Sequence, residues 1–146
     1  MPVLKHLKEH LLLLDTHIWL WLMDGDSIIN KRFANTFEHL REEGKILISP
    51  ISFWEVGMLA EKGRIELDRD VLDWMNTCLE LPGIQISPIT PHIAIFSSRL
   101  PGTLHADPAD RLLIATAHVE NAVLVTADKK ILDYGQSKLI SVYDPT

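Results

Sequence analysis

The sequence has almost no cysteine, no membrane-length apolar run and no leader-like start. Cys78 is the only cysteine among 146 residues, so no disulfide can form within the chain, which suits a reducing compartment. The apolar run that begins at Leu11 is far too short to span a bilayer. The first ten residues lack the apolar core and cleavage site of a signal peptide. We therefore expect a cytoplasmic protein that makes no membrane contact.

Positive charge is also scarce, and several catalytic signatures are missing. The formal net charge is -6, which argues against broad nonspecific binding of nucleic acid but leaves room for a local basic groove. No glycine-rich phosphate loop, serine or cysteine nucleophile motif or CxxC pattern occurs. His17, His105 and His118 are scattered along the chain, and none of the three forms an HxxxH pattern. Zinc chemistry and covalent catalysis are therefore disfavoured.

The chain reads as one domain over residues 1–146, with residues 1–10 as a short polar lead-in. No repeat or linker divides it. Short buried strands alternate with helices along the sequence. Strands are expected at residues 11–14, 46–48, 84–86, 123–126 and 139–142, and helices at 16–23, 28–43, 49–62, 71–81, 91–100, 107–120 and 129–135. This alternation predicts an α/β fold, a three-layer α/β/α sandwich with a central, mainly parallel sheet of four to five strands.

The predicted helices carry clear core-facing residues. In the helix at 28–43, Ile29, Phe33, Phe37 and Leu40 recur at three- and four-residue spacing, so we expect them to be buried. Cys78 lies within another predicted helix and is interpreted as a buried thiol.

Four acidic residues stand where this fold collects functional groups. Asp15 and Asp128 each follow a predicted strand, while Glu55 and Asp110 lie near the starts of predicted helices. In open parallel sheets, active sites form at the carboxyl edge of the strands, and these four positions all belong to that edge. Carboxylates gathered there would repel one another unless a divalent cation lay among them.

Each acid also has a plain structural explanation. Asp107-Pro108-Ala109-Asp110 has the pattern of a helix start, Asp15 and Asp128 can each cap a helix, and Ser52 to Glu55 has the spacing of a capping box. Taken singly, a cap explains each acid better than a metal ligand does. The joint pattern favours a Mg²⁺ or Mn²⁺ site, because the ligands are hard oxygens. Such a site suits the attack of water on a phosphodiester.

Four motifs resemble the conserved blocks of PIN-domain nucleases, most closely the VapC-type toxins of type II toxin–antitoxin modules. The motifs are Leu14-Asp15-Thr16-His17, Ser52-Phe53-Trp54-Glu55-Val56, Val125-Thr126-Ala127-Asp128 and the run from Asp107 to Ala117, which is the most specific. The resemblance covers residues 11–142. It implies a Mg²⁺- or Mn²⁺-dependent endoribonuclease that is blocked by a cognate antitoxin protein and is often a homodimer.

Carried over residue by residue, the resemblance gives each acid a role. Asp15 and Asp110 would be the most direct metal ligands, Glu55 would act on metal or water, and Asp128 would complete the site. These four residues would together be the catalytic set.

The resemblance also implies supporting residues. Thr126 would order the first aspartate, and Asp107 would lie behind the ligands. Arg111, Lys129 and Lys130 are candidates for contacts with RNA phosphates, as are Lys62 and Arg64, although solvated surface is the simpler reading of each one alone. Outward-facing Trp21 or Trp54 would suit an antitoxin or dimer contact.

Two other functions compete with this one, and the second has much less support. The chain could be a catalytically silent PIN-fold binding module, acting through protein or RNA contacts, whose acids serve only as caps. A metal-dependent phosphatase is disfavoured, because phosphatases of the haloacid type need a second aspartate two positions after the first, where this chain has His17.

Overall fold

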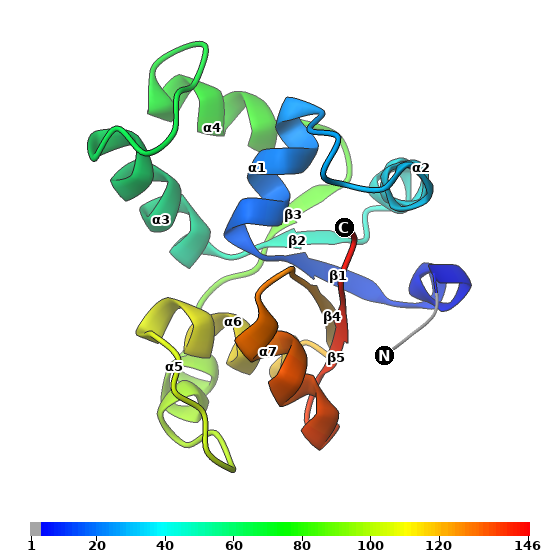
Figure 1. Ribbon diagram of the computed structural model, residues 1–146, viewed down its shortest axis with the longest axis vertical. Coiled ribbons are helices and arrows are strands. Elements are labelled where there is room, and N and C mark those ends of the chain that lie inside the picture. Colours follow the sequence, from blue (N-terminus) through cyan, green and yellow to red (C-terminus); the bar gives the residue numbers. More distant parts are fainter. Residues whose placement is uncertain (1–3) are drawn as a thin grey trace.

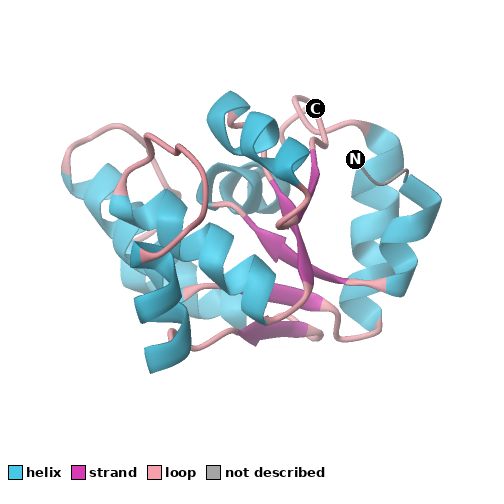
Figure 2. Cartoon of the chain, turned by 90° about the horizontal axis from the view of Figure 1, so that it is seen from below, coloured by secondary structure: helices cyan, strands magenta, loops and turns pink. Residues whose placement is uncertain are grey.

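The computed structural model describes residues 4–146, which form a five-stranded sheet with helices on both faces (Figures 1 and 2). All strand pairs are parallel, and the spatial order is β3-β2-β1-β4-β5. The strands are β1 (Leu11–Leu14), β2 (Ile46–Ile48), β3 (Ile84–Ile86), β4 (Ala122–Val125) and β5 (Ser141–Tyr143). The predicted three-layer α/β/α sandwich is confirmed.

The helices follow the strands in the predicted alternation. They are α1 (Thr16–Asp24), α2 (Lys31–Glu42), α3 (Pro50–Glu61), α4 (Val71–Leu79), α5 (Pro91–Ser98), α6 (Pro108–Val119) and α7 (Lys129–Tyr134), with the 3₁₀ helices η1 (Leu4–Glu9) and η2 (Gly135–Ser137). In Figure 1, α1 to α4 lie on one side of the sheet and α5 to α7 on the other. Among residues 4–146, no helix has both the length and the apolar character needed to cross a membrane.

Two apolar clusters fill the spaces between the sheet and its helical layers. Leu12 and Leu14 of β1 point into the cluster on the α1–α4 side, while Leu13 between them belongs to the cluster on the α5–α7 side. A strand with both faces buried must be apolar throughout, which is why β1 is four consecutive leucines. The residues predicted to be buried in the helix at 28–43 are all in the core: Ile29, Phe33, Phe37 and Leu40.

Several boundaries differ from the sequence-based expectation, each for a local reason. The second helix begins at Lys31 rather than at residue 28, because the Asn30 side chain caps it by accepting a hydrogen bond from the Phe33 amide. The last strand lies at Ser141–Tyr143 rather than 139–142. The polar lead-in contains η1, and its Leu7 is fully buried in the core.

The carboxyl edge of the sheet is where four helices begin. α1, α3 and α7 each start directly after a strand, and α6 runs back toward the start of β4, so its first turn also lies at this edge. β1 and β4 are neighbours, and the Asp15 amide donates to the Val125 carbonyl at 2.9 Å. The first residues after these two strands are therefore held side by side.

Candidate functional site

Asp15 lies at the centre of this edge and is almost entirely buried. Its side chain is the N-cap of α1 and is 9% exposed. The Thr16 amide donates to Oδ1 at 2.7 Å, and the Thr126 hydroxyl donates to Oδ2 at 2.6 Å. Burial raises the pKa of Asp15, and these two hydrogen bonds oppose the rise. The carboxylate is thus fixed in orientation, with further lone pairs on each oxygen free for a ligand.

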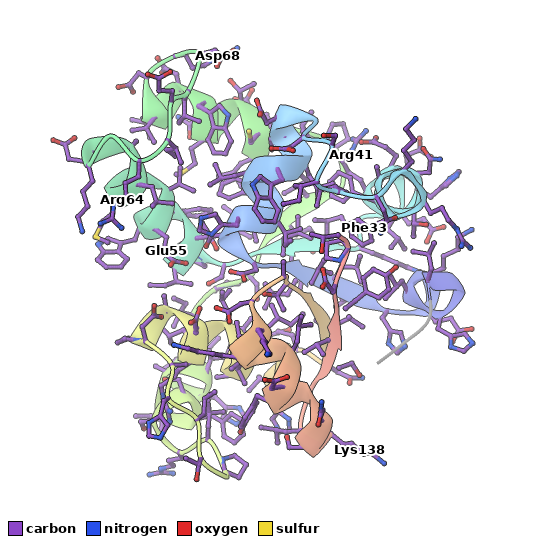
Figure 3. The ribbon with its side chains drawn as sticks, viewed as in Figure 1. Phe33, Arg41, Glu55, Arg64, Asp68 and Lys138 are labelled. Carbon is purple, nitrogen blue, oxygen red and sulfur yellow. The ribbon has the colours of Figure 1, made fainter. Side chains whose placement is uncertain are left out.

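Thr16 links Glu55 to Asp15, because it donates a hydrogen bond to each carboxylate. The Thr16 hydroxyl donates to Glu55 Oε1 at 2.6 Å and lies 2.8 Å from the Ser52 hydroxyl. Glu55 is half-buried on α3 and is labelled in Figure 3. Burial raises its pKa, and the charges of Asp15 and Asp107 raise it further.

Asp110 has the clearest electrostatic signature in the cluster. It stands in the first turn of α6 and is half-buried. Burial first, and then the charges of Asp107, Asp15, Asp128 and Glu55, together raise its pKa to about 7. Every one of these charge effects is repulsive, so the five carboxylates share one region of space and Asp110 lies among them.

Asp107 and Asp128 are helix caps at the edge of the same cluster. Asp107 Oδ1 accepts from the Asp110 amide at 2.9 Å, and Asp128 Oδ1 accepts from the Lys130 amide at 2.8 Å. The Asp128 amide in turn donates to the Thr126 hydroxyl at 3.0 Å. Thr126 therefore links the two aspartates that follow β1 and β4.

The structural roles of the acids divide into two groups. Asp15, Asp107 and Asp128 are N-caps, as their local sequences indicated. The capping-box interpretation of Glu55 was wrong, because Ser49 rather than Ser52 caps α3 by accepting from the Ile51 amide, and the helix begins at Pro50. Capping explains three of the acids but neither Glu55 nor Asp110.

The donor set fits a hard divalent cation by its chemistry. Five carboxylates converge, and the charges that act most strongly on the Asp110 pKa are all negative. Oxygen donors of this kind suit Mg²⁺ or Mn²⁺. Within residues 4–146, no three His, Cys, Asp or Glu side chains are already arranged to hold an ion, so these carboxylates would have to rotate to share one.

The basic residues predicted near the site differ in what they contact. Arg111 donates from Nε to the Ser97 carbonyl at 2.9 Å and from Nη1 to the Leu104 carbonyl at 3.3 Å, so part of its guanidinium is occupied by the end of α5 and by the loop before α6. Lys129 and Lys130 are exposed at the start of α7. Lys62 and Arg64 are exposed at and beyond the end of α3, and Figure 3 shows Arg64 farther from the sheet edge than Glu55.

Sequence reasoning missed Thr16 and Ser52, the two buried hydroxyls that orient Glu55. Both are almost inaccessible, with exposed fractions of 2% and 0%. The only signal was their position, since Thr16 directly follows Asp15 and Ser52 lies one helical turn before Glu55.

Comparisons with known proteins agree with this architecture. A family model described as PIN domain matches residues 12–136. Ribonuclease VapC22 of Mycobacterium tuberculosis is 31% identical over 131 residues, which cover 90% of this chain and 97% of that protein. The fold is similar to VapBC2 of Rickettsia felis bound to a promoter DNA fragment, with a TM-score of 0.68, 18% identity and coverage of 92% and 98% of the two chains. It is also similar to a toxin–antitoxin complex of Klebsiella pneumoniae, with a TM-score of 0.61, 24% identity and coverage of 92% and 97%.

Proposed function

Because the chain belongs to the PIN domain family, in its VapC-type branch, we propose that it is the ribonuclease toxin of a toxin–antitoxin module. We propose that it hydrolyses RNA phosphodiester bonds with the help of Mg²⁺ or Mn²⁺ and that it acts in the cytoplasm. The observation that carries the proposal is the convergence of Asp15, Glu55, Asp107, Asp110 and Asp128 from separate elements. A helix-capping role leaves Glu55 and Asp110 unexplained.

Each residue of the cluster has a part in the proposed reaction. Asp15 and Asp110 would hold the cation, with Asp128 completing its surroundings. When bound, the cation supplies Lewis-acid polarisation of the phosphodiester and lowers the pKa of a nearby water. Glu55 is turned toward the site by the Thr16 hydroxyl on Oε1, which leaves Oε2 to accept a proton from the attacking water.

Support for Asp15 comes from Thr126, whose side chain is fully buried. The Thr126 hydroxyl donates to Asp15 and accepts from the Asp128 amide, so it sets the orientation of the first ligand and the position of the last. Asp107 caps α6 and adds negative charge behind Asp110.

The nuclease proposal is tested with purified protein, structured RNA and Mg²⁺, with and without EDTA. We expect metal-dependent cleavage that falls by orders of magnitude in Asp15→Asn and in Asp110→Asn. Asp73→Asn, which removes an exposed carboxylate from α4, is the matched control and should cleave normally. Equal cleavage by both site variants and the wild type would indicate a contaminating nuclease or a wrong site. Absence of cleavage by all forms across a panel of RNAs would favour the silent binding module, whose acids serve as caps.

A cavity of about 540 Å³ suits the proposed antitoxin partner. It lies between α1, α4 and the connector that follows α3, with Leu20, Trp21 and Trp74 among its apolar lining residues. Asp24, Asp26 and Glu66 supply acidic groups to the same lining. Apolar and acidic groups together are complementary to an amphipathic basic segment, so we propose that the antitoxin docks here.

Growth assays test the toxin role and this docking surface together. Expression of the protein should arrest growth, and coexpression of the short protein encoded beside it should relieve the arrest. The double variant Asp24→Lys/Glu66→Lys should still arrest growth but resist relief, because it repels a basic partner. Glu42→Lys, an exposed charge reversal at the end of α2, should be relieved like the wild type. Harmless expression at confirmed protein levels would count against the toxin role, and full relief of the double variant against the docking surface.

We also propose that the protein is a homodimer. Trp54 on α3 is 57% exposed and Ile95 on α5 is 51% exposed, so both helices leave large apolar side chains uncovered. Light scattering should give the mass of a dimer for the wild type and of a monomer for Trp54→Lys. A monomeric wild type at micromolar concentration would reject this part of the proposal.

A further inference from the structure

A second cavity, of about 710 Å³, begins beside the acidic cluster and is not used by the chemistry described above. One wall is α7 with η2, and the other is the loop at residues 101–105. Lys130 lies two residues after Asp128, and His105 lies two residues before Asp107, so this end of the cavity adjoins the site. Figure 3 places Lys138 at the far end of the α7–η2 segment. We call this cavity the α7 groove.

The loop wall of the α7 groove is tied to the body of the molecule. The Tyr134 hydroxyl donates to the Pro101 carbonyl at 2.7 Å, which joins the loop to α7. Arg111 donates to the Ser97 and Leu104 carbonyls, which joins the chain on either side of that point to α6. Tyr134 is only 8% exposed, so its ring is packed in the core and holds the hydroxyl in place. Hydrogen bonds therefore fix the loop that forms one wall of the groove to α7, which forms the other wall, and to α6.

The lining of the α7 groove is more basic than the chain as a whole. The molecule has a formal net charge of -6, yet the groove contains Lys130, Lys138 and His105 against one acid, Asp133. Within residues 4–146 neither lysine forms an ion pair. The cavity beside α1 and α4, by contrast, is lined by several acids. Among these two cavities, the α7 groove is the one suited to an anionic chain.

We infer that the α7 groove binds the single-stranded RNA that flanks the bond to be cut. Lys130 would contact the backbone phosphate nearest the acidic cluster, and Lys138 would add positive charge at the far end. Leu104, Tyr134 and Leu139 supply apolar surface for ribose and base contacts. Because these groups meet backbone and ring faces, binding would be nearly independent of base sequence. The inference rests on the proposed ribonuclease function and names where its substrate lies.

A binding experiment isolates the groove from catalysis. Fluorescein-labelled oligouridylate is titrated with Asp15→Asn protein, which retains the groove, over a series of KCl concentrations. Adding Lys130→Glu should weaken binding about tenfold and lower the slope of log affinity against log salt by about 0.7 for each lost phosphate contact. Lys138→Glu should weaken binding less. Lys31→Glu, the same charge change at the start of α2, is the matched control and should match the Asp15→Asn parent.

Photo-crosslinking reports the path of the RNA directly. Oligouridylates carrying 4-thiouridine at successive positions are irradiated on the Asp15→Asn protein, and the attached peptides are identified by mass spectrometry. We expect attachment within residues 101–105 and 134–139. Attachment only in the cavity beside α1 and α4, no binding at low salt, or equal affinity of Lys130→Glu and Lys31→Glu would each overturn the inference.

Steady-state cleavage separates failure of the groove from failure of the enzyme. In a wild-type background, Lys130→Glu should raise KM for oligouridylate about tenfold and change kcat by no more than a few-fold. If the wild type cuts RNA and Lys130→Glu leaves KM unchanged, the groove inference fails and the ribonuclease proposal stands. If the wild type cuts no RNA with any divalent cation, the ribonuclease proposal fails, and the binding and crosslinking results still decide the groove.

Discussion

At the scale of single residues, Asp110 shows how the fold concentrates unfavourable charge. Its carboxylate is half-buried and meets the charges of four other acids, which together bring its pKa to about 7. The helix dipole at the start of α6 would by itself favour the charged form. Burial and repulsion outweigh that effect, which is the expected balance at a site built to receive a cation.

This raised pKa makes the stability of the folded protein depend on pH. Between about pH 4 and pH 7 the folded state holds a proton on Asp110 that the unfolded state has lost, so the free energy of unfolding should fall as pH rises through that window. We expect a loss on the order of 1–2 kcal/mol, because solvent screens a half-exposed group. Urea unfolding in EDTA at about pH 5 and pH 8 measures it, and Asp110→Asn should show a smaller decline. Parallel pH profiles for wild type and variant would contradict this assignment.

The acids themselves were predictable from local sequence patterns, but the hydroxyls that orient them had no such pattern. A strand followed by an aspartate is a local pattern, and it identified Asp15 and Asp128. The bond from Thr16 to Glu55 joins residues 39 positions apart, and that from Thr126 to Asp15 joins residues 111 positions apart. For Thr126 only the family resemblance pointed to the contact, and for Thr16 the only signal was its position directly after Asp15.

At the scale of elements, the sequence predicted the interiors of helices and strands better than their boundaries. The strands at 46–48 and 84–86 were placed correctly, because short apolar runs between turn signals have few other interpretations. The start of α2 was placed three residues early, since Ile29 fits the helical period although Asn30 is the cap. The burial of Leu7 was not predicted, because a single apolar residue between polar neighbours forms no periodic pattern.

Gly83 is the glycine at which an added side chain has least room. It precedes β3 with a φ of 86°, and a Cβ there would stand 1.4 Å from the Arg41 carbonyl oxygen. Gly25 has a similar φ of 66° but nothing within 4 Å. We expect Gly25→Ala to cost roughly 1–2 kcal/mol for its left-handed backbone. Gly83→Ala should cost about 1–3 kcal/mol more, because the end of α2 must move away from β3.

Urea denaturation of the two alanine variants measures this difference, and the shared backbone conformation makes Gly25→Ala the internal control. Equal midpoints would mean that the chain relieves the Gly83 clash without loss. A larger effect would identify the contact between the end of α2 and the turn before β3, where Arg41 also donates to the Pro82 carbonyl, as a fixed point of the fold.

At the scale of the whole molecule, the acidic cluster joins both helical layers. Asp15 and Glu55 come from the α1–α4 side, and Asp110 and Asp128 begin helices on the α5–α7 side (Figure 1). Alternation of short strands and helices was enough to predict this layering, because right-handed parallel crossovers allow few other arrangements. The strand order, which places β1 beside β4, brings Asp15 and Asp128 together, and no local pattern specifies it.

A cation shared across the two layers should therefore stabilise the entire fold. A ligand that binds only the folded state adds about 2.7 kcal/mol at a hundred times its Kd. We expect Mg²⁺ or Mn²⁺ to raise the Tm more at about pH 8 than at about pH 5, because Asp110 must lose its proton to bind. KCl at equal ionic strength controls for screening, and Asp110→Asn should lose most of the shift while Asp73→Asn keeps it. Equal shifts in both variants would place cation binding elsewhere on the protein and remove the physical basis for catalysis at this edge.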